Sequence, residues 1–505
     1  MMERNGTTSS RPLPTPPPPA RLSGEDLAFW WIDSPMQPST MAMLMILDRA
    51  PDALQLRNAF ERAVVAVPRL AQRVVDAPLD LTLPRWQDDP TFDLDYHLRR
   101  HGLSGAADLD QLFREIGPVY ETPFDRSRPL WEARIYDGLG HDGRSAMFFK
   151  LHHAVADGVG GNAIFAAMTD WERQPNLPAP NGSAHAQRGI WPQQKPLSTR
   201  VLDALRDRIE LDIGRATAFA GTLVDTFQHP EKLTRAAQAL GSMVEVNSFD
   251  SHSPLKQLAG RARRLSAVEL PFAEVRAIKR ALGGSMIDVI LTIMARGIGK
   301  WHVKHHVYNV KELMTLVPVN LRKPEEWAEK ANVGNVASGI LVPLPIRLRD
   351  PLATFHEIHR RMEAKKADPA TAASPLMAEV MSVFPRRFLN WVAESTFGNI
   401  DFIVTNVPGI LVPRYLAGTE IVAAYPFAPV AMKSPVSVAL YGYRETLFIG
   451  LDSDESSMPD VDVFKAMIVE AFGELRAAAN RKPRPQRRRR AADEALEAKR
   501  GSVGA

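Results

Sequence analysis

Two adjacent histidines, followed by an aspartate and a glycine, are the sharpest chemical feature of the sequence. They are His152, His153, Asp157 and Gly158, in the pattern His-His-x-x-x-Asp-Gly. A neutral imidazole accepts a proton near pH 7, so a histidine beside a bound substrate is suited to general-base catalysis. The chain has only 13 histidines among 505 residues, which makes a chance match to this pattern rare. The pattern therefore indicates an acid–base site.

The residues around the motif predict a strand, a turn and a helix. If 146–153 is an extended strand, His153 ends a row of apolar side chains, whereas His152 shares the opposite face with Lys150. We therefore expect His153 to act as the general base and His152 to support it. Asp157 precedes an apolar helix, and Gly158 permits close backbone approach at the turn.

Other catalytic chemistries find little support in the sequence. The chain has no cysteine, which excludes disulfides, thiolate nucleophiles and thiolate metal sites. It has no Gly-x-Ser-x-Gly motif of serine hydrolases. Histidines at helical spacing lack matching acidic partners, so we expect them on solvated helix faces and predict no metal. They are His302, His305, His306, His356 and His359.

The net charge of +4 is misleading about the folded part of the chain. Residues 481–505 carry +6, so residues 1–480 carry −2. A body of this charge excludes a basic nucleic-acid-binding domain. We interpret the tail as solvated and disordered, with contact of Arg487–Arg490 to anionic lipid headgroups or nucleic acid as the alternative.

The order of predicted elements indicates an α+β fold, because strands and helices mix without a βαβ rhythm. Residues 1–21 are proline-rich and predict disorder, and no run of 18 apolar residues predicts a membrane span. Helices are expected near 109–121, 202–227, 287–301 and 461–479, and strands at 40–47, 92–97, 130–136, 146–153, 313–319, 336–345, 401–405, 421–424, 437–443 and 446–451. The predicted units are a first half over 22–172, a linker with a long helical connection over 173–261, a second half over 262–479, and a basic tail over 480–505.

Several further segments share their order with one enzyme family. Together with the histidine motif they cover about residues 22–478, and they resemble the bacterial wax ester synthase/diacylglycerol acyltransferase family of the chloramphenicol-acetyltransferase-like superfamily. The segments are Leu22–Asp26, Phe92–His97, Pro129-Leu130-Trp131, Val317–Arg322, Gly334-Asn335 and Asn406-Val407-Pro408-Gly409.

The resemblance implies two chloramphenicol-acetyltransferase-like halves of mixed sheet with flanking helices and one active site between them. It makes His153 the general base that deprotonates an acceptor hydroxyl, which then attacks an acyl-CoA thioester directly. It gives Asp157 an orienting role through an ion pair, for which Arg322 is the expected partner. Acyl-CoA is then a substrate, and no cofactor is expected.

One position departs from the family pattern. The family usually has Asn-Asp at the start of the first helix of the second half, and this chain has Ile287-Asp288. An asparagine can donate a hydrogen bond near the reacting carbonyl, and isoleucine cannot. Loss of an oxyanion donor costs ~10²–10³ in rate. The alternative is that Asp288 alone holds the helix start and the asparagine is replaceable.

The resemblance implies a long-chain acyl transfer to diacylglycerol or a long-chain alcohol, giving triacylglycerol or wax ester. Such substrates imply a cytoplasmic protein peripherally bound to the inner membrane face or to lipid droplets. Two alternatives stay open: a condensation-type acyltransferase with a carrier-bound donor, and a catalytically weak lipid-binding or droplet protein.

Overall fold

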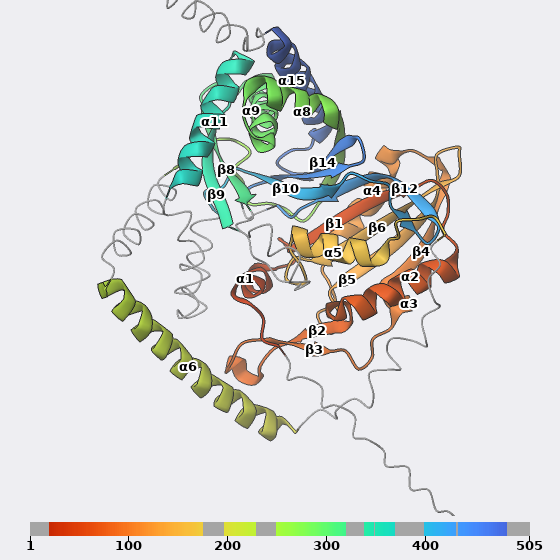
Figure 1. The fold of residues 1–505 in the computed structure, drawn as a ribbon, viewed down its shortest axis with the longest axis vertical. Helices are drawn as coiled ribbons and strands as arrows, with labels where there is room; N and C mark the ends of the chain where they lie inside the picture. The colour runs from red at the N-terminus through yellow and green to blue at the C-terminus, as the bar shows by residue number, and fades with distance from the viewer. Residues whose placement is uncertain are drawn as a thin grey trace, which may run out of the picture.

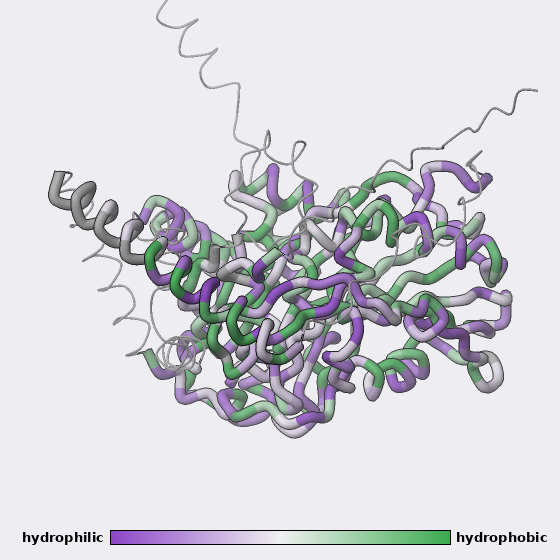
Figure 2. The backbone as a smooth tube through the Cα atoms, turned by 90° about the horizontal axis from the view of Figure 1, so that it is seen from below, coloured by the Kyte–Doolittle hydropathy of each residue, from purple (hydrophilic) through white to green (hydrophobic). Residues whose placement is uncertain are grey.

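Two six-stranded mixed sheets form the centre of the molecule (Figure 1). The computed structural model describes residues 20–174, 196–228, 249–319, 338–347, 349–368, 398–430 and 433–481. Hydrophobic segments run through the interior, and the outer loops are mostly hydrophilic (Figure 2). Mixed sheets with flanking helices confirm the α+β prediction.

The first sheet has the strand order β11-β12-β1-β6-β5-β4. Its neighbours are antiparallel, except that β4 and β5 run parallel. The central strand β1 is almost entirely apolar and mostly buried, as expected for a strand covered on both faces. The strands are β1 (Thr40–Leu47), β4 (Leu98–Ala107), β5 (Trp131–Leu139), β6 (Arg144–His152), β11 (Tyr415–Leu416) and β12 (Thr419–Phe427).

The second sheet has the order β7-β14-β13-β10-β8-β9, in which β10 runs parallel to both of its neighbours. Helices α8, α9, α11 and α15 cover one face of this sheet (Figure 1). The strands are β7 (Arg263–Pro271), β8 (Glu312–Val319), β9 (Ser338–Pro345), β10 (Phe402–Ile410), β13 (Val436–Tyr443) and β14 (Thr446–Asp454), and the helices are α8 (Phe272–Leu282), α9 (Met286–Lys304), α11 (Pro351–Ala367) and α15 (Val461–Arg481).

The remaining elements, except α6, belong to the first half of the chain. Helix α6 lies apart from both sheets, beside the small β2–β3 sheet (Figure 1), and Asp207 of α6 pairs with Arg85 of β3. The elements are α1 (Gly24–Ile32), α2 (Ala53–Ala66), η1 (Pro68–Ala71), β2 (Gln72–Val75), η2 (Pro78–Asp80), β3 (Arg85–Asp88), α3 (Leu94–His97), α4 (Leu109–Glu121), α5 (Gly158–Met168) and α6 (Leu197–Gln228).

Local sequence patterns predict most elements well. The strand over 40–47 and the helix over 109–121 are confirmed with the same bounds. The strand predicted over 92–97 is wrong, because Leu94–His97 forms the short helix α3. The Asp93 side chain accepts a hydrogen bond from the Asp95 backbone N–H and caps that helix. This local bond outweighs the strand-like alternation of the segment.

The first sheet combines strands from both halves of the sequence. Strands β11 and β12 follow β10 in the chain, but they complete the first sheet, where β12 pairs with β1. Beside this junction, β14 of the second sheet approaches β12 very closely. A Cβ atom on Gly450 would lie 1.6 Å from the carbonyl oxygen of Pro426. Only glycine therefore allows this approach.

Replacing Gly450 by alanine should destabilise the protein, because the added methyl group must push β12 and β14 apart. We expect a loss of about 1–3 kcal/mol, the usual cost of overpacking, measured as a lower urea midpoint. Gly473→Ala in α15 is the matched control, since a Cβ there meets nothing within 4 Å. That variant should be neutral or slightly stabilising. Equal effects of the two substitutions would contradict the close contact.

Candidate active site

The backbone on both sides of the two motif histidines is fixed by neighbouring strands. The His152 N–H donates to the Leu130 carbonyl at 2.9 Å, and the His153 N–H donates to the Ser39 carbonyl at 2.7 Å. Leu130 directly precedes β5, and Ser39 directly precedes β1. The Pro129-Leu130-Trp131 segment and the histidine motif are therefore neighbours in space.

His153 lies just beyond the end of β6, in the turn that leads to α5. The strand alternation predicted through residue 153 therefore ends one residue earlier. The half-buried His153 ring stacks on Phe29 of α1, with ring centroids 3.7 Å apart and planes 15° from parallel. A reciprocal capping box between Ser23 and Asp26 begins α1. Helix α1 thus places an aromatic ring flat against the candidate base.

His152 is enclosed, and a hydrogen bond to Nδ1 orients its ring. Its Nδ1 accepts the Ala154 N–H at 3.0 Å, so Nε2 carries the proton and lies 3.6 Å from Asp33 Oδ1. Trp30 and Phe124 contact its ring edge-on, and only 1% of the residue is exposed. The two histidines therefore differ in access: His152 is a buried support, and His153 is the more open ring.

Asp33 connects His152 to the loop between α1 and β1. Its Oδ1 accepts the Ser39 N–H at 2.7 Å, and its Oδ2 accepts from Arg126 at 2.8 Å. Burial alone would raise the pKa of this carboxyl, but the neighbouring His152 and the hydrogen bonds from Arg126 and the Ser39 N–H lower it below its usual value. Asp33 therefore stays ionised and holds the loop against His152.

Lys150 lies under the same site without reaching solvent. Its Nζ donates to the Val119 carbonyl at 2.7 Å and to the Thr122 carbonyl, at the C-terminal end of α4. Burial lowers its pKa to about 8. Lys150 and His152 both contact the Phe124 ring, as expected for residues on one face of β6. The lysine therefore anchors α4 to the strand that ends in the histidines.

Asp157 and Gly158 form the start of α5. The Asp157 side chain accepts the Gly160 N–H at 2.7 Å, which makes it the N-cap of this helix. A Cβ atom on Gly158 would lie 3.0 Å from the Val407 side chain of β10. The Asn162 side chain also donates to the Pro408 carbonyl at 2.6 Å. The histidine motif therefore meets the 406–409 segment of the second half.

The 406–409 segment itself is packed too tightly for side chains at its end. A Cβ atom on Gly409 would lie 1.8 Å from the Gly442 carbonyl oxygen of β13. Asn406 is exposed, and Pro408 is half-buried. Glycine at 409 thus allows β10 to carry Pro408 up to α5.

Arg414, which sequence reasoning missed, holds the other end of α5. Its buried guanidinium donates to the Thr169 carbonyl at 2.5 Å and to the Ala166 carbonyl at 3.1 Å. It also lies over the Trp171 ring at 4.0 Å. A cation at a helix C-terminus satisfies its free carbonyls and favours its dipole. Both ends of α5 are therefore fixed by residues that follow β10 or belong to it.

Trp131 and His97 form a buried aromatic pair beside β6. Trp131 donates from Nε1 to the Leu70 carbonyl at 2.7 Å, and its own backbone N–H bonds to the Pro129 carbonyl at 3.0 Å. Its ring stacks on His97 at 4.6 Å. Burial lowers the pKa of His97 to about 4, so that ring is neutral at pH 7. The Pro-Leu-Trp segment therefore supports the strand rather than presenting a titrating group.

Comparison with known proteins identifies the family. Residues 22–290 match the wax ester synthase/diacylglycerol acyltransferase catalytic domain, and residues 333–476 match the C-terminal domain of the same family. The chain belongs to this acyltransferase family. A Mycobacterium tuberculosis protein, provisionally named a diacylglycerol O-acyltransferase, is 31% identical over 460 residues, which cover 88% of this chain and 89% of that protein. A second, similarly named protein of that organism is 25% identical, over 88% and 93% of the two chains.

Solved structures share the two-lobed fold. The wax ester synthase/diacylglycerol acyltransferase from Marinobacter aquaeolei matches with a TM-score of 0.62 and 19% identity, covering 91% of this chain and all of that one. The first condensation domain of a calcium-dependent antibiotic synthetase matches with a TM-score of 0.55 and 16% identity, covering 91% and 96%. At these identities the match shows the fold, which is that of condensation and chloramphenicol-acetyltransferase-like enzymes.

Several family positions can now be placed. Asp288 is fully buried, closes a capping box with Ser285 at the start of α9, and accepts from His359 Nδ1 at 2.9 Å. The neighbouring Ile287 packs against the core of the second half. Three residues expected from the family pattern, Arg322, Gly334 and Asn335, lie outside the described residues. The expected ion pair of Asp157 with Arg322 therefore stays a prediction.

The histidines at helical spacing are not all on solvated faces. His302 is fully buried, and its Nε2 bonds to Ser253 Oγ at 2.9 Å, so that part of the prediction is wrong. His305 pairs with Asp460, and His359 with Asp288. Within the described ranges, no group of three or more His, Asp or Glu side chains is arranged to hold a metal.

A cavity of about 360 Å³ opens far from the histidines. It lies at the start of β6, where Arg144, Asp142 and Tyr425 line it. The motif lies at the other end of the same strand, nine residues away. This cavity therefore plays no part in the placement of His153.

Asp157→Ala should cost stability and activity together, because the cap fixes the turn that follows the histidines. We expect a loss of about 0.5–2 kcal/mol in unfolding free energy. Asp350→Ala is the matched control, since Asp350 caps α11 in the same way by accepting from the Leu352 and Ala353 N–H groups. Both variants should lose similar stability in urea, but only Asp157→Ala should lose acyl transfer. Full activity of folded Asp157→Ala would contradict the orienting role.

The buried carboxyl of Asp452 in β14 should make the stability of the protein depend on pH. It is fully buried next to Tyr120, and burial raises its pKa to about 7, although Arg263 opposes this rise. An unfolded aspartate has a pKa near 3.9. Between about pH 4 and pH 7 the folded protein therefore keeps a proton that the unfolded chain loses, and stability falls as pH rises. Asp452→Asn should flatten the change in urea midpoint between about pH 5 and pH 7.5. An unchanged slope would show that Asp452 does not titrate there.

Proposed function

We propose that this protein transfers a long-chain acyl group from acyl-CoA to the hydroxyl of diacylglycerol, a long-chain alcohol or both. The observation that carries the proposal is the placement of His153. Its imidazole is the less buried of the two motif rings, and its backbone is fixed by Ser39. Family membership supplies the acyltransferase chemistry.

The proposed reaction needs one base and no covalent enzyme intermediate. The His153 imidazole takes the proton of the acceptor hydroxyl as its oxygen attacks the thioester carbonyl. The carbon–sulfur bond then breaks, and the CoA thiolate leaves with the proton that His153 returns. The products are the ester, triacylglycerol or wax ester, and free CoA. A chain without cysteine suits this direct transfer.

The surrounding residues would act on orientation. His152 and Asp33 hold the strand end and its neighbouring loop, and the Asp157 cap fixes the following turn. Phe29 covers one face of the His153 ring. An apolar ring beside the base would exclude water from the reacting thioester and so favour transfer to an alcohol over hydrolysis.

The decisive experiment offers the purified protein radiolabelled palmitoyl-CoA with hexadecanol or with dioleoylglycerol, and separates the lipid products. Labelled wax ester or triacylglycerol is the expected result. The condensation fold makes a carrier-bound donor the second candidate, so the same acyl group on an acyl carrier protein is the parallel arm. Transfer only from the carrier would favour that candidate. No transfer from either donor would favour a lipid-binding role.

His153→Ala should lower turnover by about 10²–10⁴ while the protein stays folded, because it removes the base. His152→Ala is the comparison, since it removes a buried support with no access to the acceptor. We expect that loss to be smaller and to come with a lower melting temperature. Steady-state rates and thermal unfolding of both variants check this. A larger rate loss at His152 would overturn the assignment.

We also propose that α6 binds a lipid surface, since the substrates are nearly insoluble in water. Within the described residues, no single helix is long and apolar enough to cross a membrane; α8 and α9 meet that test only as a pair bent by 101°. However, α6 presents Leu202, Ile209 and Ile213 outward with 60–66% of each exposed. Their spacing puts them on one face of the helix, as in helices that lie in a membrane interface.

Replacing Leu202, Ile209 and Ile213 together by serine should weaken binding to vesicles. Partial burial of each side chain contributes about 1 kcal/mol, so the partition coefficient should fall tenfold or more. Flotation with phosphatidylcholine/phosphatidylglycerol vesicles measures this. Leu54→Ser with Leu258→Ser is the control, because these leucines are equally exposed elsewhere. Unchanged flotation of the triple variant would exclude α6 as the lipid contact.

A further inference from the structure

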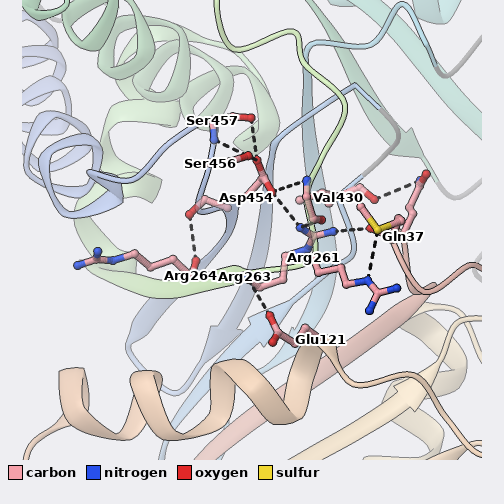
Figure 3. A network of polar contacts seen from close by, with 12 residues as sticks. Gln37, Glu121, Arg261, Arg263, Arg264, Val430, Asp454, Ser456 and Ser457 are labelled. Atoms are coloured by element: carbon pink, nitrogen blue, oxygen red, sulfur yellow. Dashed lines mark hydrogen bonds and ion pairs between the residues drawn. The ribbon is translucent and has the colours of Figure 1, made fainter.

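A buried arginine from the second half reaches across to the first. Arg263 begins β7, and its side chain is only 2% exposed. Its Nη1 lies 3.3 Å from Oδ1 of Asp454, an equally buried carboxylate at the end of β14. Figure 3 shows this pair at the centre of a network of polar contacts. A buried charge needs a partner of opposite charge, and Arg263 has this partner in Asp454.

The rest of Arg263 contacts the first half at two places. Its Nη2 donates to the Met36 carbonyl at 3.1 Å, within the loop 33–39 that joins α1 to β1. Its backbone N–H donates to Glu121 Oε2 at 3.1 Å, at the last residue of α4. The planar guanidinium thus spans a carboxylate of one half and a backbone carbonyl of the other, which a single ammonium cannot copy.

Two more residues hold the same loop from the second half. Arg261 Nε lies 3.3 Å from Met36 Sδ, and Gln37 Nε2 donates to the Val430 carbonyl at 3.5 Å (Figure 3). This loop ends at Ser39, whose backbone carbonyl accepts the His153 backbone N–H. It begins at Asp33, which faces His152. The loop is therefore the direct link between the second half and both motif histidines.

The Asp454 carboxylate has hydrogen-bond partners other than Arg263. It also accepts from the Gly260 N–H at 2.7 Å, the Ser457 N–H at 3.0 Å and Ser457 Oγ at 2.8 Å. These bonds satisfy it within the second half. The Nη2–Met36 bond is the contact by which the Arg263 side chain extends this network into the first half.

We propose that Arg263 is a positioning residue: it fixes the loop 33–39 from the second half and thereby holds His153 in the geometry for proton transfer. This inference rests on the proposed function. A misplacement of about 1 Å in a reacting group can cost 10²-fold in rate, so a contact two steps away can govern turnover. Arg263 would act on kcat and not on substrate affinity, because its side chain is buried against Asp454 and the loop 33–39 and has little surface to offer a substrate.

The test is Arg263→Lys in the full chain. Lysine keeps a positive charge beside Asp454 but loses the second arm that reaches Met36. We expect kcat for palmitoyl transfer to fall about tenfold, KM for palmitoyl-CoA and for hexadecanol to change less than about twofold, and the melting temperature to stay close to that of the wild type. Arg264→Lys is the matched control, because Arg264 is the next residue, is exposed and pairs with Asp462. It should match the wild type in all three quantities.

The alternatives give distinct results. If Arg263 is only structural, activity per folded molecule stays at the wild-type level in Arg263→Lys, and the proposal is wrong. If the wild type itself transfers no acyl group, the proposed function fails, and the inference fails with it. If Arg263→Lys does not fold, Gln37→Ala takes its place, since it cuts a loop contact at the rim without leaving a buried charge. A kcat of Gln37→Ala equal to that of the wild type then overturns the proposal.

Discussion

The pairing of β12 with β1 is the constraint on which the rest of the structure depends. Six residues of β1, from Ala42 to Leu47, pair with β12, and buried backbone groups must be bonded in this way. Because β12 comes late in the chain, the first sheet is incomplete without this strand from the second half. The chain segment from β10 to β12 also places Pro408 and Arg414 at the two ends of α5. The site is thus assembled by sheet closure, not by either half alone.

Near the two motif histidines, charged side chains form hydrogen bonds and ion pairs within the protein. Asp33 is bonded by Ser39 and Arg126, and the Lys150 ammonium by two carbonyls at the end of α4. Burial costs each of these groups hydration, so each must be bonded to persist. A network satisfied in this way has few alternative arrangements, which is what preorganised catalysis requires. The half-buried His153 lies close to these hydrogen-bonded groups, since it follows directly on His152.

Local patterns predicted what local forces determine. The strand expected from the apolar run over 40–47 and the helix expected over 109–121 both match the structure, and the histidine motif indicated the candidate site. The sequence did not predict that β12 joins the first sheet, because strand partners far apart in the chain leave no periodic signal. Arg263 and Arg414 were missed for the same reason: an isolated arginine has no pattern, and its role depends on carbonyls that only the fold brings near. The strand prediction over 92–97 was wrong because a single aspartate, Asp93, caps the short helix α3 there.

At the start of α9, two neighbouring residues differ in their roles. Asp288 holds that helix through Ser285 and His359, and none of these bonds involves the side chain at 287. A change of residue 287 therefore leaves the bonds that hold the start of this helix intact. Isoleucine there packs on the core and donates no hydrogen bond. If this position faces the thioester in the family, its oxyanion in this chain must be stabilised from elsewhere. Under the proposed function, residue 287 is thus a position that can change the rate without changing His153, the proposed general base.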